Sequence, residues 1–193
     1  MMKVKEQMEY APGNAERVLL HTCCAPCSSA IIEDMLKHGV RPVIYYCNPN
    51  IWPFEEYEVR KNECSRYAEA LGLEIVDDDW DHEAWKDYVA GLEDEPERGG
   101  RCLLCFRYRL LRAARYAAQT GIGVVTTTLA SSRWKSLEQI NEAGEWACRQ
   151  AGATWWGRNW RKGGLQQRRQ DIIREYGFYN QLYCGCEFSM KHK

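Results

Sequence analysis

The stretch RVLLHTCCAPCSSAIIEDMLKHG, residues 17–39, places a short apolar run, three cysteines and a helical pattern in direct succession. The apolar run, residues 17–23, has the length and composition of a buried strand. A helix is predicted from Ser28, a favourable N-cap residue, to Gly39, which can end it. A buried strand that leads directly into a helix is the opening unit of an α/β fold.

The rest of the chain repeats this alternation of strand and helix. Further strands are predicted at residues 41–47, 73–79, 124–132 and 153–156. Further helices are predicted at residues 55–72, 81–92, 102–121, 136–152 and 168–177. This order predicts a parallel sheet with right-handed crossovers, whose ligands bind beyond the carboxyl ends of the strands. We expect residues 1–16 to form a flexible arm and residues 17–193 to form a single α/β domain with an irregular, cysteine-containing C-terminal tail.

Composition excludes several classes of protein. The 193 residues are 45% hydrophobic and 27% charged, which is ordinary for a globular domain. No apolar run approaches the roughly 20 residues of a membrane span, and the N-terminus is too polar for a secretory signal. The net charge of −1 gives no general basic excess, so a polyanionic partner would have to use a local patch. Ten cysteines without a signal peptide indicate a reducing compartment, the cytoplasm.

Seven of the cysteines fall in three clusters: Cys23, Cys24 and Cys27; Cys102 and Cys105; Cys184 and Cys186. A disulfide between the neighbours of the first cluster would be strained, and adjacent thiolates repel one another unless a cation neutralises them. The CxxC pair shares one face of a predicted helix start, where the helix dipole stabilises thiolates. Structural zinc, an iron–sulfur cluster and metal-free thiol chemistry all remain open from the spacing alone.

The CGC pair near the C-terminus is a separate case. Its single glycine permits tight backbone geometry around two close thiols. Cys184 and Cys186 could form a labile disulfide, supply two ligands to a second metal, or be inert.

A basic and aromatic segment follows the last predicted strand. In TWWGRNWRKGGLQQRRQDIIR, residues 154–174, tryptophans alternate with arginines and a lysine. Such a segment can contact phosphates and stack on bases, although a solvated basic helix with core tryptophans has the same composition. Asn48 and Asn50, in the NPNIWP loop after the second strand, could contact a substrate or serve only the turn.

Six motifs together resemble one family, the QueH-type epoxyqueuosine reductases. In chain order they are HTCCAPCS, YYCNPNIWPFEEYEVR, GGRCLLCFRYRL, TTTLASSRWKSLEQI, RKGGLQQRR and GFYNQLYCGCEFS. The resemblance runs from about residue 18 to residue 189. It implies a Rossmann-like sheet of the nucleotide-hydrolase-like variant, and reduction of epoxyqueuosine to queuosine at the wobble position of tRNA. It also implies a 4Fe–4S cluster, an additional mononuclear iron and an external electron donor.

Carried over by motif position, the resemblance assigns roles to individual residues. Cys23, Cys24, Cys102 and Cys105 would bind the cluster. Cys184 and Cys186 would be a redox-active pair or ligands of the extra iron, which Cys27 could also bind. The tRNA would be contacted by the following residues: Lys135, Trp160, Arg161, Lys162, Gly163 and Gly164. One departure lies at Ser132-Arg133-Trp134-Lys135, where the family often has Ser-Pro-Tyr-Lys.

The reaction needs a proton donor, and two rival functions remain. His21, Asp79, Lys135 and Tyr183 are the candidate donors. One rival is an ATP-using sulfur-transfer enzyme acting on tRNA, but CCAPC stands where such enzymes need a glycine-rich loop. The other rival is a zinc-stabilised RNA-binding module, which would lack redox activity.

Overall fold

The computed structural model describes residues 9–192 and contains one five-stranded, all-parallel sheet in the order β3-β2-β1-β4-β5. The strands are β1 (Arg17–Thr22), β2 (Arg41–Tyr46), β3 (Ile75–Asp77), β4 (Val124–Thr127) and β5 (Thr154–Trp155). This confirms the predicted α/β class and all five predicted strands.

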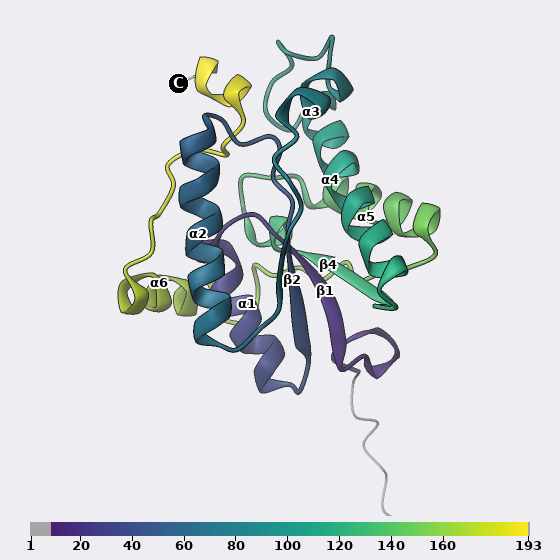
Figure 1. The fold of residues 1–193 in the computed structure, drawn as a ribbon, viewed down its shortest axis with the longest axis vertical. Coiled ribbons are helices and arrows are strands. Elements are labelled where there is room, and N and C mark those ends of the chain that lie inside the picture. The colour runs from purple at the N-terminus through teal and green to yellow at the C-terminus, as the bar shows by residue number, and fades with distance from the viewer. Residues whose placement is uncertain (1–8, 193) are drawn as a thin grey trace, which may run out of the picture.

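Helices cover both faces of the sheet. On one side lie α1 (Ala25–Lys37), α2 (Phe54–Ala70) and α6 (Leu165–Tyr176), and on the other lie α4 (Gly100–Gln119) and α5 (Leu137–Ala151) (Figure 1). The short helix α3 (His82–Tyr88) precedes α4, and single 3-10 turns lie at Pro12–Asn14, Thr128–Ser131 and Glu187–His192. The division follows from right-handed crossovers, because the chain winds from β1 to β3 in one direction and then returns to β4 and β5 in the other.

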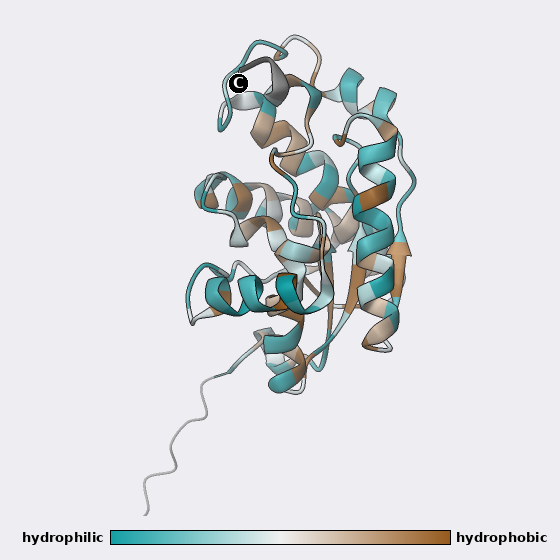
Figure 2. Ribbon diagram, turned by 90° about the vertical axis from the view of Figure 1, so that its left-hand side faces the viewer, coloured by the Kyte–Doolittle hydropathy of each residue, from teal (hydrophilic) through white to brown (hydrophobic). Residues whose placement is uncertain are grey.

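The core lies between these layers. Leu19 of β1 lies beside Val43 of β2 and beside Val125 of β4, and all three are buried. The strands are mostly apolar, whereas polar residues gather on the outer faces of the helices (Figure 2). Strands buried on both faces explain why the sequence shows continuous apolar runs instead of alternation. Among the described residues, the structure has no helix that is both long and apolar enough to cross a membrane.

Four local features differ from the sequence-based prediction. Helix α1 begins at Ala25 with Cys24 at the N-cap, so Ser28 lies inside the helix instead of capping it. Strand β4 ends at Thr127 because a 3-10 turn takes up the next four residues. Helix α6 begins at Leu165, three residues earlier than predicted.

The fourth difference concerns the predicted N-terminal arm. The Tyr10 ring stacks on His38 with 4.1 Å between centroids, and its hydroxyl donates to Asp34. Ala11 is buried in the core. This part of the predicted arm therefore packs on the domain, and residues 1–8 lie outside the described residues.

The C-terminal tail runs back over the carboxyl edge of the sheet. Ile51, in the loop after β2, pairs with Cys186 in an antiparallel bridge, and the amide of Trp52 donates to the carbonyl of Gly185 at 2.8 Å. Because β1 and β4 are neighbours whose crossovers leave in opposite directions, the crevice between their carboxyl ends is the binding position expected of such sheets. The tail closes one side of this crevice.

Candidate metal–thiolate active site

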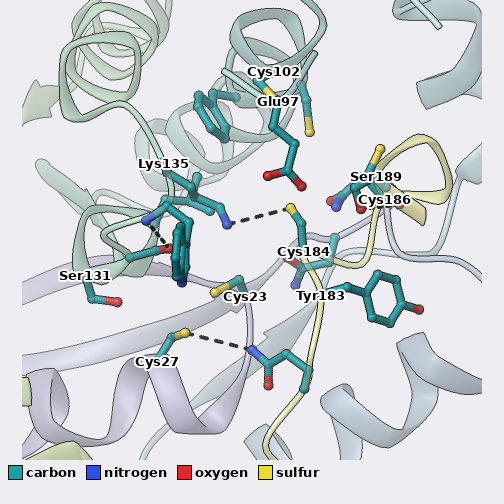
Figure 3. Close-up of a pocket in the computed structure, with 18 of the residues that line it drawn as sticks. Cys23, Cys27, Glu97, Cys102, Ser131, Lys135, Tyr183, Cys184, Cys186 and Ser189 are labelled. Carbon is teal, nitrogen blue, oxygen red and sulfur yellow. Dashed lines mark hydrogen bonds between the residues drawn. The ribbon is translucent and has the colours of Figure 1, made fainter. Parts of the chain in front are cut away.

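A cavity of about 920 Å³ lies at this edge, and all three cysteine clusters reach it. Six cysteines line it: Cys23, Cys27, Cys102, Cys105, Cys184 and Cys186. Figure 3 shows the thiols of Cys23, Cys102 and Cys184 around one space, with Lys135 and Glu97 between them. The fold thus brings together segments that are about 80 residues apart in the chain.

The first cluster sits at the junction of β1 and α1. The sulfur atoms of Cys23, Cys24 and Cys27 all lie within 4.8 Å of one another, close enough to hold a metal ion. Cys24 is the N-cap of α1 and Cys27 follows in its first turn, so the positive end of the helix dipole faces these sulfurs.

Hydrogen bonds among these three thiols shift their pKa values in different directions. Hydrogen bonds from Cys24 and Cys27 hold the pKa of Cys23 well below its ordinary value. Burial raises the pKa of Cys24, and the hydrogen bond to Cys23 raises that of Cys27 to about 12. The group therefore carries one thiolate readily, whereas further thiolates need a cation beside them.

The second cluster opens α4. Cys102 lies in the first turn of this helix, and Cys105 lies one turn further on and is buried. Burial raises the pKa of Cys102 to about 11. The predicted helix-start position of the CxxC pair is confirmed, so two helix N-termini, each carrying thiols, point at one cavity. Cys102 and Cys105 are not part of the close group formed by Cys23, Cys24 and Cys27.

The two cysteines of the tail have different neighbours. The Cys184 sulfur accepts a hydrogen bond from the Lys135 ammonium at 3.7 Å (Figure 3). Cys186 instead packs in a small apolar cluster with Cys105, Trp85 and Phe188. Both are free thiols here, as are the other eight cysteines.

Two cationic side chains, buried Arg109 and half-buried Lys135, lie beside these thiols. Arg109 is fully buried and donates to the Cys105 sulfur, the Cys47 carbonyl and the Asn48 side chain. Burial would lower the pKa of Lys135, but attraction to Cys184 and Cys23 outweighs it and raises the pKa. Within residues 9–192, no carboxylate forms an ion pair with Arg109 or Lys135. Cations that are withdrawn from water without a carboxylate partner are costly, so this site suits an anionic centre. A metal held by thiolates meets that requirement.

The structure separates the candidate proton donors. His21 is buried with both ring nitrogens bonded, to Thr127 and the Cys47 carbonyl, and burial lowers its pKa to about 3. Asp79 is exposed and lies outside the cavity lining. The Tyr183 hydroxyl donates to the Trp52 carbonyl and points away from the cavity (Figure 3). Only Lys135 of the four presents its polar group to the cavity.

Glu97 is an acid that the sequence did not single out. It lies in the loop before α4, and Figure 3 shows its carboxylate directed into the cavity near Cys184. Among the described residues this carboxylate has no hydrogen bond or ion pair, and it is the only acidic group in the lining.

The residues predicted to contact tRNA divide into two groups. Arg161 and Lys135 line the cavity, whereas Lys162, Gly163 and Gly164 lie exposed outside the lining. Trp160 is 0% exposed and packs against Trp156, so no face of its ring is open to a base. Its predicted stacking role is corrected to a core role, because the segment turns this side chain inward.

The cavity wall holds several unpaired polar atoms. Among the described residues, five buried side-chain atoms in the lining have no hydrogen-bond partner: Asn50 Oδ1, Trp85 Nε1, Gln139 Oε1, Arg161 Nε and Gln181 Oε1. Buried polar groups without partners are rare, and their concentration in one cavity indicates a ligand site. Asn50 is 2% exposed, whereas Asn48 is fully bonded to Thr22 and Arg109. Asn50 is therefore the better candidate for a substrate contact.

Comparisons with known proteins place the chain in a family. The family model described as "Epoxyqueuosine reductase QueH" matches residues 18–192. A protein of that name from Histophilus somni is 44% identical over 189 residues, covering 97% of this chain and 77% of the relative. One from Acinetobacter baylyi is 43% identical over 93% of this chain and 83% of its own. One from Thermotoga maritima is 33% identical over 90% of each chain. The chain belongs to the QueH family of epoxyqueuosine reductases, which are oxidoreductases.

Proposed function

We propose that this protein reduces epoxyqueuosine to queuosine in tRNA, in the cytoplasm, with electrons supplied by an external donor. The observation that carries the proposal is the cavity itself. Its wall combines six thiols with eight basic side chains and one acidic one, on a chain whose net charge is −1. Thiols suit a redox centre, and the local basic excess suits a phosphate-bearing substrate.

The reduction can be written with the tail cysteines as the immediate reductant. The epoxide loses its oxygen as water and becomes an alkene, which requires two electrons and two protons. Cys184 and Cys186, both as thiols, supply both and end as a disulfide. Two electrons and two protons from the external donor then restore the dithiol.

Cys23, Cys24, Cys102 and Cys105 would hold a 4Fe–4S cluster, and Cys27, with its sulfur close to those of Cys23 and Cys24, would bind an additional iron. When bound, such a cluster supplies electrons one at a time. The buried Arg109 and the half-buried Lys135 would offset the negative charge of the thiolates. In this scheme the cluster, bound in part by Cys23 and Cys24, would hold electrons away from the substrate, and the tail dithiol would react with the substrate.

Lys135 and Glu97 would manage protons near the substrate. Lys135 already donates to the Cys184 sulfur, so it can stabilise that thiolate as the dithiol reacts. Glu97 directs its carboxylate to the same region and can carry a proton between solvent and the departing oxygen. Asn50 would orient the base through its unpaired Oδ1.

The proposal is tested with protein purified without oxygen. We expect about four or five irons and four sulfides per chain, with a visible band that bleaches on reduction. Reduced protein should convert epoxyqueuosine in tRNA to queuosine, measured by mass spectrometry of the digested nucleosides. Cys148→Ala is the control, because Cys148 is buried outside the cavity. One zinc per chain, no sulfide and no conversion would support the RNA-binding module instead.

A further inference from the structure

Trp134 is the most exposed tryptophan of the described residues, and it stands at the cavity wall. Its side chain is 65% exposed, yet it is part of the lining. It lies in the short segment 132–136 between the 3-10 turn after β4 and helix α5. The next residue, Lys135, reaches into the cavity to Cys184. Neighbouring residues therefore present a flat aromatic surface outside and an ammonium inside.

The segment is held by side chains from two other parts of the chain. Arg98 donates to the carbonyl of Trp134 at 2.9 Å and to that of Arg133 at 3.1 Å. Arg161 donates to the carbonyl of Lys135 at 2.8 Å. Because three successive carbonyls are fixed, the position of the Trp134 backbone is set before any ligand arrives.

The residues around Trp134 indicate what kind of molecule could bind to its ring. The Arg133 guanidinium lies 4.7 Å from the centroid of the indole ring. Single-stranded nucleic acid is held by aromatic rings on which bases stack, together with cations that meet the phosphates. An indole beside arginines, on a wall with eight basic groups and one acidic group, has both components.

We propose that Trp134 stacks on a nucleobase adjacent to the modified nucleotide of a single-stranded RNA loop, while the modified base enters the cavity past Lys135. The inference rests on the proposed function and adds a residue that positions its substrate. A cavity that admits one base leaves the neighbouring bases outside, and Trp134 is the exposed ring available there. Trp160, the sequence-based candidate for stacking, is buried and cannot serve.

The test is a double-mutant cycle between Trp134 and the RNA. Binding of a fluorescent anticodon stem-loop with guanine at the wobble position is measured by anisotropy for the wild type, Trp134→Ala and Trp134→Phe. Two further stem-loops lack the base on one or the other side of the wobble nucleotide. Trp146→Ala is the matched control, because Trp146 also has an arginine over its ring, at 5.4 Å, but lies outside the cavity lining.

We expect Trp134→Ala to weaken binding of the intact loop by about 5- to 150-fold, the range for losing one base–aromatic stack. Trp134→Phe should recover most of this loss, and Trp146→Ala should bind as the wild type does. On one of the two abasic loops, the wild type and Trp134→Ala should bind equally well.

The salt dependence separates stacking from a general disturbance of the basic wall. Trp134→Ala should leave the slope of log Kd against log salt unchanged, because no phosphate contact is lost. Equal binding of the intact loop by the wild type and Trp134→Ala, or an undiminished effect of Trp134→Ala on both abasic loops, would overturn the inference. Since these measurements use an unmodified loop, they stand even if the protein fails to reduce epoxyqueuosine.

Discussion

The two cysteine-bearing sides of the cavity are built in different ways. The junction of β1 and α1 places Cys23, Cys24 and Cys27 through local structure, since strand and helix are both buried in the core. The tail places Cys184 and Cys186 through contacts with distant residues: Arg60 donates to the carbonyls of Tyr183 and Cys184, and Ile51 pairs with Cys186. A junction fixed by the core suits metal ligands, whereas a segment held by a few contacts suits thiols that change their bonding during each cycle.

The largest expected effect tests the junction. Cys24→Ser removes a proposed ligand at the N-cap of α1, and we expect metal affinity to fall by more than about 100-fold, the upper range for mutating groups that only orient ligands. Iron and sulfide analysis of anaerobically purified protein measures this, with Cys148→Ala as the control. If Cys24→Ser keeps the iron content of the wild type, Cys24 is not a metal ligand.

The second prediction tests the tail. Cys184→Ser should keep its iron and lose turnover by on the order of 10³-fold or more, because the dithiol then cannot form a disulfide. Assays with epoxyqueuosine tRNA and metal analysis are made on the same sample. If Cys184→Ser loses its iron as well, the tail and the β1–α1 junction form one metal site, and the proposed difference between their roles is wrong.

The third prediction weakens the docking of the tail without touching a thiol. Gly185 has a φ of +101°, and an added Cβ would lie 2.9 Å from Ile51 Cγ1 and 3.0 Å from an Arg60 nitrogen. Gly185→Ala should therefore destabilise tail docking by about 1–3 kcal/mol. Hydrogen exchange should rise by about 5- to 150-fold in residues 178–189 and stay unchanged in β1.

A matched control isolates the effect on the tail. Gly121 also has a positive φ, +70°, but an added Cβ would meet nothing within 4 Å. It lies between α4 and the amino end of β4, whereas the tail lies at the carboxyl edge of the sheet, so Gly121→Ala should leave exchange in residues 178–189 as in the wild type. Equal exchange in the tail of both variants would show that the tail is not held at Gly185.

The smallest expected effect concerns an ion pair outside the cavity, between Asp78 and Arg112. Burial opposes ionisation of Asp78, but hydrogen bonds from Arg112, at 2.6 and 2.9 Å, hold its pKa below the ordinary value. Because the folded pKa is lowered, the stabilisation is present above the unfolded pKa of about 3.9 and is lost as pH falls through the folded value.

Asp78→Asn should therefore lower the melting temperature at pH 7, with a cost under about 1 kcal/mol because the pair is partly exposed. The difference should vanish in acid, below the folded pKa of Asp78. Thermal melts of the wild type and Asp78→Asn across pH 2–7 measure this, and a difference that is constant with pH would contradict it. Iron content should not change, since the pair lies outside the cavity lining.

Much of the fold could be predicted because apolar runs and helical periodicity are local signals. The five strands along the chain and the position of the CxxC pair at a helix start both follow from them. The N-cap was mispredicted because Ser28 is a common cap and Cys24 is not, whereas the helix begins where the strand turns into the crevice. The geometry of the strand–helix junction, and not the capping preference of single residues, therefore decides where the helix begins.

The sequence did not reveal which side chains of the site are buried and which are exposed. Trp134 and Trp160 both lie beside basic residues, yet one is mostly exposed and the other is fully buried. Arg109 carries a charge, yet it lies buried beside Cys105. Glu97 lies in a polar loop whose path depends on Arg101, which binds the carbonyls of Leu92, Glu93 and Glu95. These placements depend on contacts between distant segments, which no local pattern encodes.

The order of these segments along the chain also bears on how the protein matures. Cys23, Cys24, Cys102 and Cys105 leave the ribosome well before the tail residues that line the cavity, such as Cys184 and Cys186. Domains begin to fold from the N-terminal side during synthesis. The sheet and both helix N-termini can thus form while the last wall is still missing. The proposed cluster would be inserted most easily in that interval, before the tail covers its side of the crevice.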